Sequence, residues 1–166
     1  MTETVIRQAL RDSVNEVLER MFFVETQGEC ADPECAEPAG DAPADEIAAA
    51  LTFQGEPPGA LLLRLTSGAA RQIAADFLGI DEAEVSDVQT SEVVRELANM
   101  ICGSVLSRVE SAAAFHLAAP RIVPPSAEIA GSLSNTRYCV LLSNGRLTVN
   151  IGTGIPICPQ PAQSAC

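Results

Sequence analysis

Two long stretches of the chain place apolar residues at helical spacing. In residues 3–23 one apolar stripe runs beside charged positions, and it consists of Ile6, Leu10, Val14, Val17, Leu18 and Met21. Residues 91–110 contain no proline and a single glycine, and their apolar face consists of Val94, Leu97, Ile101 and Val105. Ser91 is placed to cap this second stretch, and Glu92 favours a helix N-terminus electrostatically. Each stretch therefore predicts a helix that buries one face against a sheet.

Shorter apolar runs bounded by turn residues predict strands. Residues 48–54 and 59–66 are predicted to be two strands joined by a four-residue turn with two prolines. Residues 60–63 form an unbroken apolar run, which is typical of a strand buried on both faces. A helix is expected next, with Ser67 as its cap and Gly79 at its C-terminal end.

The last third of the chain carries further strand signals. Between two of the predicted strands, Asn144-Gly145 is a strong hairpin signal. The strands expected in this part are residues 115–123, 127–131, 136–142 and 146–151. With the helices they predict an α+β fold, in which one largely antiparallel sheet has the long helices packed along it. We expect a single domain over residues 1–155 and a proline-containing tail over 156–166.

The polar side of the second helix carries a pattern with chemical meaning. Glu96, Asn99 and Gly103 lie within about 60° of one another at about 100° per residue, roughly opposite the apolar face. A carboxylate and a carboxamide thus lie one turn apart, and the next turn has a residue without a side chain. Glycine inside a helix costs about 1 kcal/mol relative to alanine, so Gly103 needs a reason. Close approach by another surface is one such reason.

This Glu-x-x-Asn-x-x-x-Gly arrangement resembles that of the CheC/CheX family of chemotaxis phosphatases, and the chain is closest to the CheX branch. The preceding segments, Gly59–Leu65 and Ser67–Gly79, resemble the strand-then-helix module of that family and precede the motif helix at about its distance. The resemblance covers residues 48–123 well and the C-terminal strands only in pattern. It implies the CheC-like fold and a stand-alone phosphatase.

The resemblance also implies a substrate and roles for the three motif residues. The substrate would be the aspartyl phosphate of a phosphorylated CheY-like receiver protein. Asn99 would position the attacking water, Glu96 would dock against the receiver's lysine, and Gly103 would leave room for the partner's backbone. The chain would need no cofactor of its own, because the receiver carries Mg²⁺. The CheX branch further implies a homodimer that pairs through its sheets.

Three other interpretations of these residues stay open. The flagellar switch proteins are related and use the same fold for assembly, which would make this chain a non-catalytic binding or scaffold module. The chain could instead be a redox or zinc-binding protein that uses Cys30 and Cys35, although zinc would need two more ligands nearby. In the first helix, Asp12-x-x-Asn15 resembles a degenerate second motif. Glu19 stands where that motif needs glycine, so a solvated helix face is the better interpretation.

Composition argues against several other classes of function. The 166-residue chain has 10 basic and 22 acidic residues, a formal net charge of −12. This balance disfavours a nucleic-acid-binding surface, which needs a basic stripe. No apolar run reaches the roughly 18 residues of a membrane span, so we expect no membrane insertion and a cytoplasmic protein. Residues 26–46 hold seven acidic residues, no basic residue and three prolines, which predicts a poorly ordered acidic insertion.

The cysteines show no spacing typical of a disulfide framework. In a reducing cytoplasm all six are expected to be free thiols. Cys102 and Cys139 fall in apolar stretches and are expected to be small buried hydrophobes. The other four cysteines are Cys30, Cys35, Cys158 and Cys166.

Overall fold

The computed structural model describes residues 2–30, 45–109 and 114–154. These residues form three α-helices, one short 3₁₀ helix and six strands, and none of the helices is long and apolar enough to cross a membrane. In chain order the elements are α1 (Glu3–Met21), β1 (Glu46–Gln54), β2 (Gly59–Thr66), α2 (Ser67–Leu78), η1 (Glu82–Glu84), α3 (Asp87–Val109), β3 (His116–Leu117), β4 (Arg121–Val123), β5 (Ser134–Leu142) and β6 (Gly145–Thr153).

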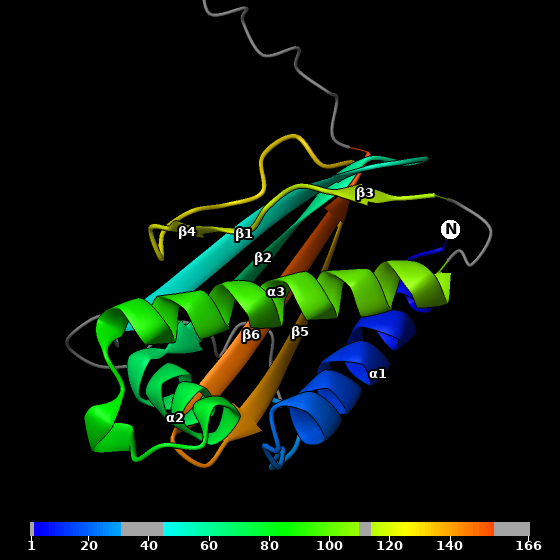
Figure 1. The fold of residues 1–166 in the computed structure, drawn as a ribbon. Coiled ribbons are helices and arrows are strands. Elements are labelled where there is room, and N and C mark those ends of the chain that lie inside the picture. The colour runs from blue at the N-terminus through cyan, green and yellow to red at the C-terminus, as the bar shows by residue number, and fades with distance from the viewer. Residues whose placement is uncertain (1, 31–44, 110–113, 155–166) are drawn as a thin grey trace, which may run out of the picture.

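The six strands form one sheet with the order β3-β1-β2-β6-β5, and the short β4 also pairs with β1 (Figure 1). Every strand pair is antiparallel. The three α-helices lie on one face of the sheet, with α3 against β1 and β2 and α1 against β5. The predicted α+β fold class is therefore confirmed.

The hydrophobic core lies between the helices and the sheet. Alternate residues of neighbouring strands point into it, and on β2 and β6 the paired core residues are Leu61 with Ile151, Leu63 with Val149 and Leu65 with Leu147. The predicted stripe of α1 faces them, and its buried members are Ile6, Leu10, Val14, Val17 and Leu18. Met21 ends the helix and is 51% exposed, so the stripe is one residue shorter than predicted.

Both predicted hairpins are present. β1 and β2 pair along their length, and β5 and β6 are joined by a turn at residues 143–144. Gly145 follows that turn with a φ of +146°, and an added Cβ would collide with the Thr66 side chain, so only glycine fits there. Thr66, and not Ser67, is the N-cap residue of α2, whereas Gly79 ends that helix in the left-handed conformation as predicted.

The strands predicted at residues 115–123 and 127–131 are corrected by the structure. The first is two short strands, β3 and β4, which both pair with β1. Residues 127–131 form no strand. This part of the chain crosses the face of the sheet opposite the helices, where the Arg64 guanidinium donates hydrogen bonds to the carbonyls of Pro125 and Ala127. A side chain thus supplies the hydrogen bonds that a neighbouring strand would otherwise provide.

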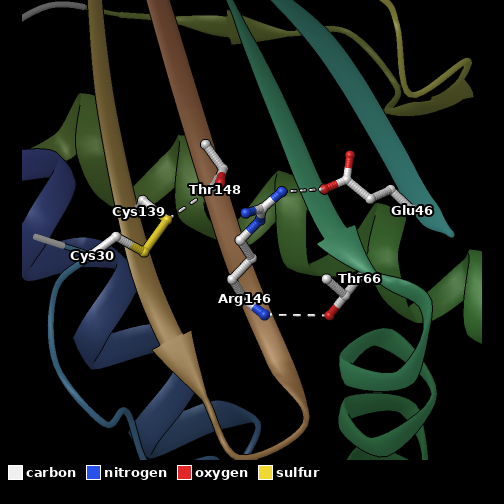
Figure 2. The surroundings of a disulfide bond; sticks show 6 residues. All are labelled: Cys30, Glu46, Thr66, Cys139, Arg146 and Thr148. Atoms are coloured by element: carbon white, nitrogen blue, oxygen red, sulfur yellow. Dashed lines mark hydrogen bonds and ion pairs between the residues drawn. A yellow bond between two sulfur atoms is a disulfide. The ribbon is translucent and has the colours of Figure 1, made fainter. Parts of the chain in front are cut away.

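The prediction of free thiols is wrong for two cysteines. Cys30 and Cys139 form a disulfide that joins the segment after α1 to β5, across a sequence separation of 109 residues (Figure 2). Cys139 is consequently not a buried hydrophobe. It lies half-exposed on the open face of the sheet, where the Thr148 hydroxyl donates to its sulfur at 3.6 Å. Figure 2 also shows Arg146 on this face, paired with Glu46 at 3.3 Å.

The disulfide also bears on the zinc alternative. The sulfur of Cys30 is bonded to Cys139 and is not paired with Cys35, which lies outside the described residues together with Cys158 and Cys166. Among the described residues, no group of three or more His, Cys, Asp or Glu side chains could hold a metal ion. Cys102 is buried as predicted, and burial raises the pKa of its thiol to about 12.

The segment Gln27–Cys30 covers part of the outer edge of β5. Three backbone hydrogen bonds of 2.9–3.1 Å join it to Cys139–Leu141, next to an isolated bridge. At the other end of the predicted insertion, Glu46 is the first residue of β1. The predicted boundaries of 26–46 are therefore too wide. The rest of the insertion, residues 31–44, and the predicted tail lie outside the described residues.

Replacing Cys30 with serine should lower the melting temperature. The cross-link closes a loop of roughly 110 residues in the unfolded chain, and removing a native disulfide typically costs about 2–5 kcal/mol. In a protein of this size that corresponds to a decrease on the order of 5–15 °C. Thermal unfolding followed by circular dichroism without reductant measures the effect.

Cys139→Ser and the double variant are the matched controls, because all three proteins lack the same bond and should melt alike. Reductant should bring the wild type to their melting temperature and leave the variants unchanged. A wild-type protein that melts identically with and without reductant contradicts a stabilising role for the disulfide.

Candidate functional site

Helix α3 begins at Asp87, four residues earlier than predicted. Its first turn is closed by a capping box, in which the Gln89 N–H donates to the Ser86 hydroxyl at 3.1 Å and the Ser86 N–H donates to the Gln89 side chain at 2.9 Å. Ser91, the predicted cap, lies inside the helix. Arg71 of α2 pairs with Asp87 at 3.1 Å, so the start of α3 is joined to its neighbour.

The inner side of α3 is buried against the sheet and α1. Its buried residues are Thr90, Val93, Val94, Leu97, Ala98, Ile101, Cys102, Val105 and Leu106. Near the C-terminal end, the Ser104 hydroxyl donates to the Ser13 hydroxyl at 3.0 Å, and Arg108 pairs with Glu16. Figure 1 shows α1 beside this end of α3 and α2 beside its start. These contacts hold α3 in one orientation relative to the sheet.

Glu96, Asn99 and Gly103 lie on the outward side of α3. Glu96 is exposed, and the other two are half-exposed. Residues three positions apart on a helix have Cβ atoms about 5–6 Å apart, so the carboxylate and the carboxamide are neighbours. Within the part of the chain that the structure describes, neither side chain has a hydrogen-bond or ion-pair partner. Both polar groups are therefore available to bind another molecule.

Gly103 faces open space in the described part of the chain. A Cβ added there would meet no atom of the described residues within 4 Å, apart from the helix backbone. Its carbonyl accepts a hydrogen bond from the Ser107 hydroxyl at 2.8 Å, which any residue at position 103 would allow. Packing among the described residues therefore does not require glycine at this position, and its lack of a side chain leaves the helix backbone uncovered next to the motif.

The related pattern on α1 has different surroundings. The Asn15 carboxamide is hydrogen-bonded to the Tyr138 hydroxyl, with Nδ2 at 3.3 Å from the oxygen. Burial raises the pKa of Tyr138, and the hydrogen bond with Asn15 opposes this shift. Asp12 accepts a hydrogen bond from Gln8 at 2.9 Å. Asp12 and Asn15 are thus engaged within the fold, whereas Glu96 and Asn99 have no partner among the described residues.

The motif surface is a convex helix side. An open groove is present elsewhere, and residues of β1, α2 and the first turns of α3 line it, with none of the three motif residues among them. Small-molecule sites are concave and bury most of their ligand. A convex polar surface is better suited to a protein partner.

Residues 47–143, more than half of the chain, match the family model described as chemotaxis phosphatase CheX. The chain belongs to the CheX family. The matched region includes all of α3, so the motif helix is part of what this chain shares with other CheX proteins. A search of curated proteins finds no match.

Solved structures have the same fold at low sequence identity. The chemotaxis protein CheX from Vibrio vulnificus is 17% identical with a TM-score of 0.73, over 92% of this chain and 99% of that one. A CheX chain in a CheX–CheY–BeF₃–Mg²⁺ complex from Borrelia burgdorferi is 17% identical with a TM-score of 0.62, over 88% and 96%. FliY from Thermotoga maritima is 12% identical with a TM-score of 0.57, over 92% and 90%. The CheC-like fold is thereby confirmed.

Replacing Gly103 with alanine should stabilise the isolated protein. Alanine is about 1 kcal/mol more favourable than glycine inside a helix, and there is room for its methyl group. The melting temperature should rise by about 2–4 °C, measured by thermal unfolding.

Gly79→Ala is the contrasting control, because Gly79 has a φ of +67° and alanine is strained there. That variant should melt at a lower temperature. A decrease for Gly103→Ala as well would mean that the fold itself needs glycine at position 103.

Proposed function

We propose that this CheX-family chain hydrolyses the aspartyl phosphate of a CheY-like response regulator. The observation that carries the proposal is that the Glu96 carboxylate and the Asn99 carboxamide, on the outward side of a firmly held helix, have no partner among the described residues. Membership of a family of chemotaxis phosphatases supports the reaction class. The roles of the individual residues are part of the proposal.

The reaction needs a water held in line with the P–O bond that breaks. The water oxygen forms a bond to phosphorus, and the bond between phosphorus and the aspartyl oxygen breaks. The aspartate leaves as a carboxylate with the bonding electrons, and the water protons pass to the phosphate product and to solvent. A receiver with its own Mg²⁺ and lysine already neutralises the charge of the phosphoryl group. The phosphatase therefore has to hold the attacking water in position.

Asn99 holds the attacking water in this proposal. A carboxamide oxygen accepts a hydrogen bond from water, while the NH₂ group remains able to donate to another atom. A glutamine orients the attacking water in GTPases in the same way. Since α3 is fixed along its inner side and at both ends, it can present the carboxamide with little movement.

Glu96 and Gly103 act in docking rather than in the chemical step. The Glu96 carboxylate pairs with the receiver's lysine, and Gly103 lets the receiver's backbone approach α3 closely. An exposed ion pair at the rim of an interface contributes about 1 kcal/mol or less, and more when it is desolvated. Glu96 should therefore influence affinity more than the maximal rate.

The proposal assigns no cofactor to this chain. The Borrelia burgdorferi complex contains CheX, CheY, BeF₃ and Mg²⁺ together, and beryllofluoride is a stand-in for a phosphoryl group. By analogy, the Mg²⁺ used here belongs to the receiver.

A homodimer and a cytoplasmic location stay predictions. The dimer is expected to pair through the C-terminal strands, because exposed strand edges are usually paired or protected. The segment Gln27–Cys30 already covers Cys139–Leu141 on the outer edge of β5, so a partner strand would pair beside Ser134–Tyr138. The disulfide bears on the location, since such bonds are uncommon in cytoplasmic proteins.

A non-catalytic binding or scaffold module on the same fold is the second candidate. The resemblance to the flagellar switch proteins raises it, and the similarity to FliY from Thermotoga maritima shows that the two proteins share the fold. The two candidates differ in one measurement, because a scaffold would bind a receiver without changing the rate at which phosphate leaves it.

Replacing Asn99 with alanine should abolish stimulated dephosphorylation. Without the carboxamide the water is not positioned, and the expected loss of rate is about 100-fold or more, equivalent to about 2.7 kcal/mol. Phosphate release from a CheY-type receiver phosphorylated with acetyl phosphate measures it.

Asn15→Ala is the matched control for this experiment. Asn15 binds Tyr138 within the fold, so its loss should lower the melting temperature and leave the rate per folded molecule unchanged. Retention of more than half of the activity by Asn99→Ala would contradict the proposal that Asn99 positions the attacking water.

Replacing Glu96 with alanine should raise the receiver concentration at half-saturation, by about fivefold for a contribution near 1 kcal/mol. Glu96→Lys should raise it further through repulsion of the receiver's lysine. Titration of each variant with phosphorylated receiver separates half-saturation from maximal rate. Glu19→Lys, an equal charge change at an exposed position on α1, is the control. Unchanged half-saturation in both Glu96 variants contradicts the docking role.

A further inference from the structure

Arg95 lies at the border of the motif surface. It precedes Glu96 directly and lies one turn before Asn99, so the side chains at positions 95 and 99 are neighbours on the helix. At about 100° per residue, the directions of the two side chains differ by about 40°. A long arginine side chain at this position can therefore extend to whatever the Asn99 carboxamide binds.

The surroundings of Arg95 differ from those of the arginines that form ion pairs in the described part of the chain. Its side chain is half-buried, and its Nε is shielded from solvent without a hydrogen-bond partner among the described residues. The neighbouring carboxylates Glu92 and Glu96 form no ion pair with it in the described part of the chain. Six other arginines do pair with carboxylates, and these are Arg7, Arg11, Arg20, Arg71, Arg108 and Arg146.

The shielded Nε holds the inner end of the guanidinium inside the fold, whereas the two Nη groups are not among the shielded atoms and have no partner among the described residues. An anionic group brought by a partner would meet the guanidinium at these Nη groups. The planar guanidinium fork matches the geometry of phosphate and carboxylate oxygens, which it binds through parallel hydrogen bonds. Of these two anions we favour the phosphoryl group, because Arg95 lies beside Asn99 and Asn99 is the residue proposed to approach that group.

We infer that Arg95 is a further catalytic residue, which donates hydrogen bonds to the non-bridging oxygens of the receiver's phosphoryl group. This inference rests on the function proposed above. Negative charge spreads over these oxygens in the transition state, and an arginine supplied by a partner protein stabilises it in GTPases. Arg95 would act in the same way from α3.

The test uses two variants that separate charge, shape and packing. Arg95→Met keeps a straight apolar stem for packing and removes the guanidinium, while Arg95→Lys keeps a positive charge without the planar fork. Arg121→Met, at an exposed arginine of β4, is the control for the change in net charge. Maximal rate and half-saturation are measured with receiver phosphorylated by acetyl phosphate, next to Asn99→Ala.

The maximal rate of Arg95→Met should fall by about 100-fold, as it does when one donor to a transition-state oxyanion is removed. Arg95→Lys should retain an intermediate rate, and Arg121→Met should remain within about twofold of the wild type. A second readout is binding to receiver with and without beryllofluoride. Arg95→Met should weaken binding of the beryllofluoride form and leave binding of the unmodified form unchanged.

Three results would overturn the inference. If Asn99→Ala is inactive and Arg95→Met keeps the wild-type rate, Arg95 has no role and the proposed function stands. If Arg95→Met raises half-saturation at an unchanged maximal rate and weakens both receiver forms equally, Arg95 docks the receiver and does not contact the phosphoryl group. If Asn99→Ala and Arg95→Met are both fully active, the roles assigned to Asn99 and Arg95 both fail, whereas a wild-type protein that does not speed phosphate release contradicts the proposed function itself. If Arg95→Met melts at a lower temperature than the wild type, the rate of Arg95→Lys decides between the two roles. A merely structural role predicts a wild-type rate for Arg95→Lys, whereas a catalytic role predicts a reduced one.

Discussion

Helix α3 can bury only one of its sides, and Leu97, Ile101 and Val105 occupy the space between it, the sheet and α1. Each large apolar side chain that is fully buried contributes about 1.5–3 kcal/mol. A rotation of α3 that turned Asn99 inward would expose several of these side chains at once and would bury a carboxamide without a partner. Because a helix repeats every 3.6 residues, the core that fixes one side also fixes the direction of the other. The orientation of the motif is thus a property of the hydrophobic core.

Most of the fold could be predicted from local patterns, because a helix or strand that buries one face repeats its apolar residues with the period of that element. The start of α3 could not. Asp87 and Val88 are exposed in its first turn, so apolar spacing begins only after the helix has begun, and Ser91 then looks like a cap in place of Ser86. The disulfide was missed for a different reason. Cys30 and Cys139 are 109 residues apart, and only the path of the chain around β5 brings them together.

The outward placement of Glu96 and Asn99 also follows from helical spacing, so this part of the site was predictable. The surroundings of each side chain were not, because they depend on residues distant in sequence. Asn15 has the same residue type and similar spacing as Asn99, yet Tyr138 binds it from 123 positions away. Arg95 gives no signal in the sequence at all, because what singles it out is that its guanidinium, beside Asn99, has no partner among the described residues.

The polar contacts of α1 determine the valency of the molecule. Asn15 is bound to Tyr138, and Glu16 pairs with Arg108 on α3, so α1 directs these groups toward its own fold. In the described part of the chain, α3 is then the one helix whose motif has its polar groups free. Under the proposed function each chain would bind one receiver at a time. A complex with two receivers would then need two copies of the chain, so its stoichiometry would report the number of folded copies.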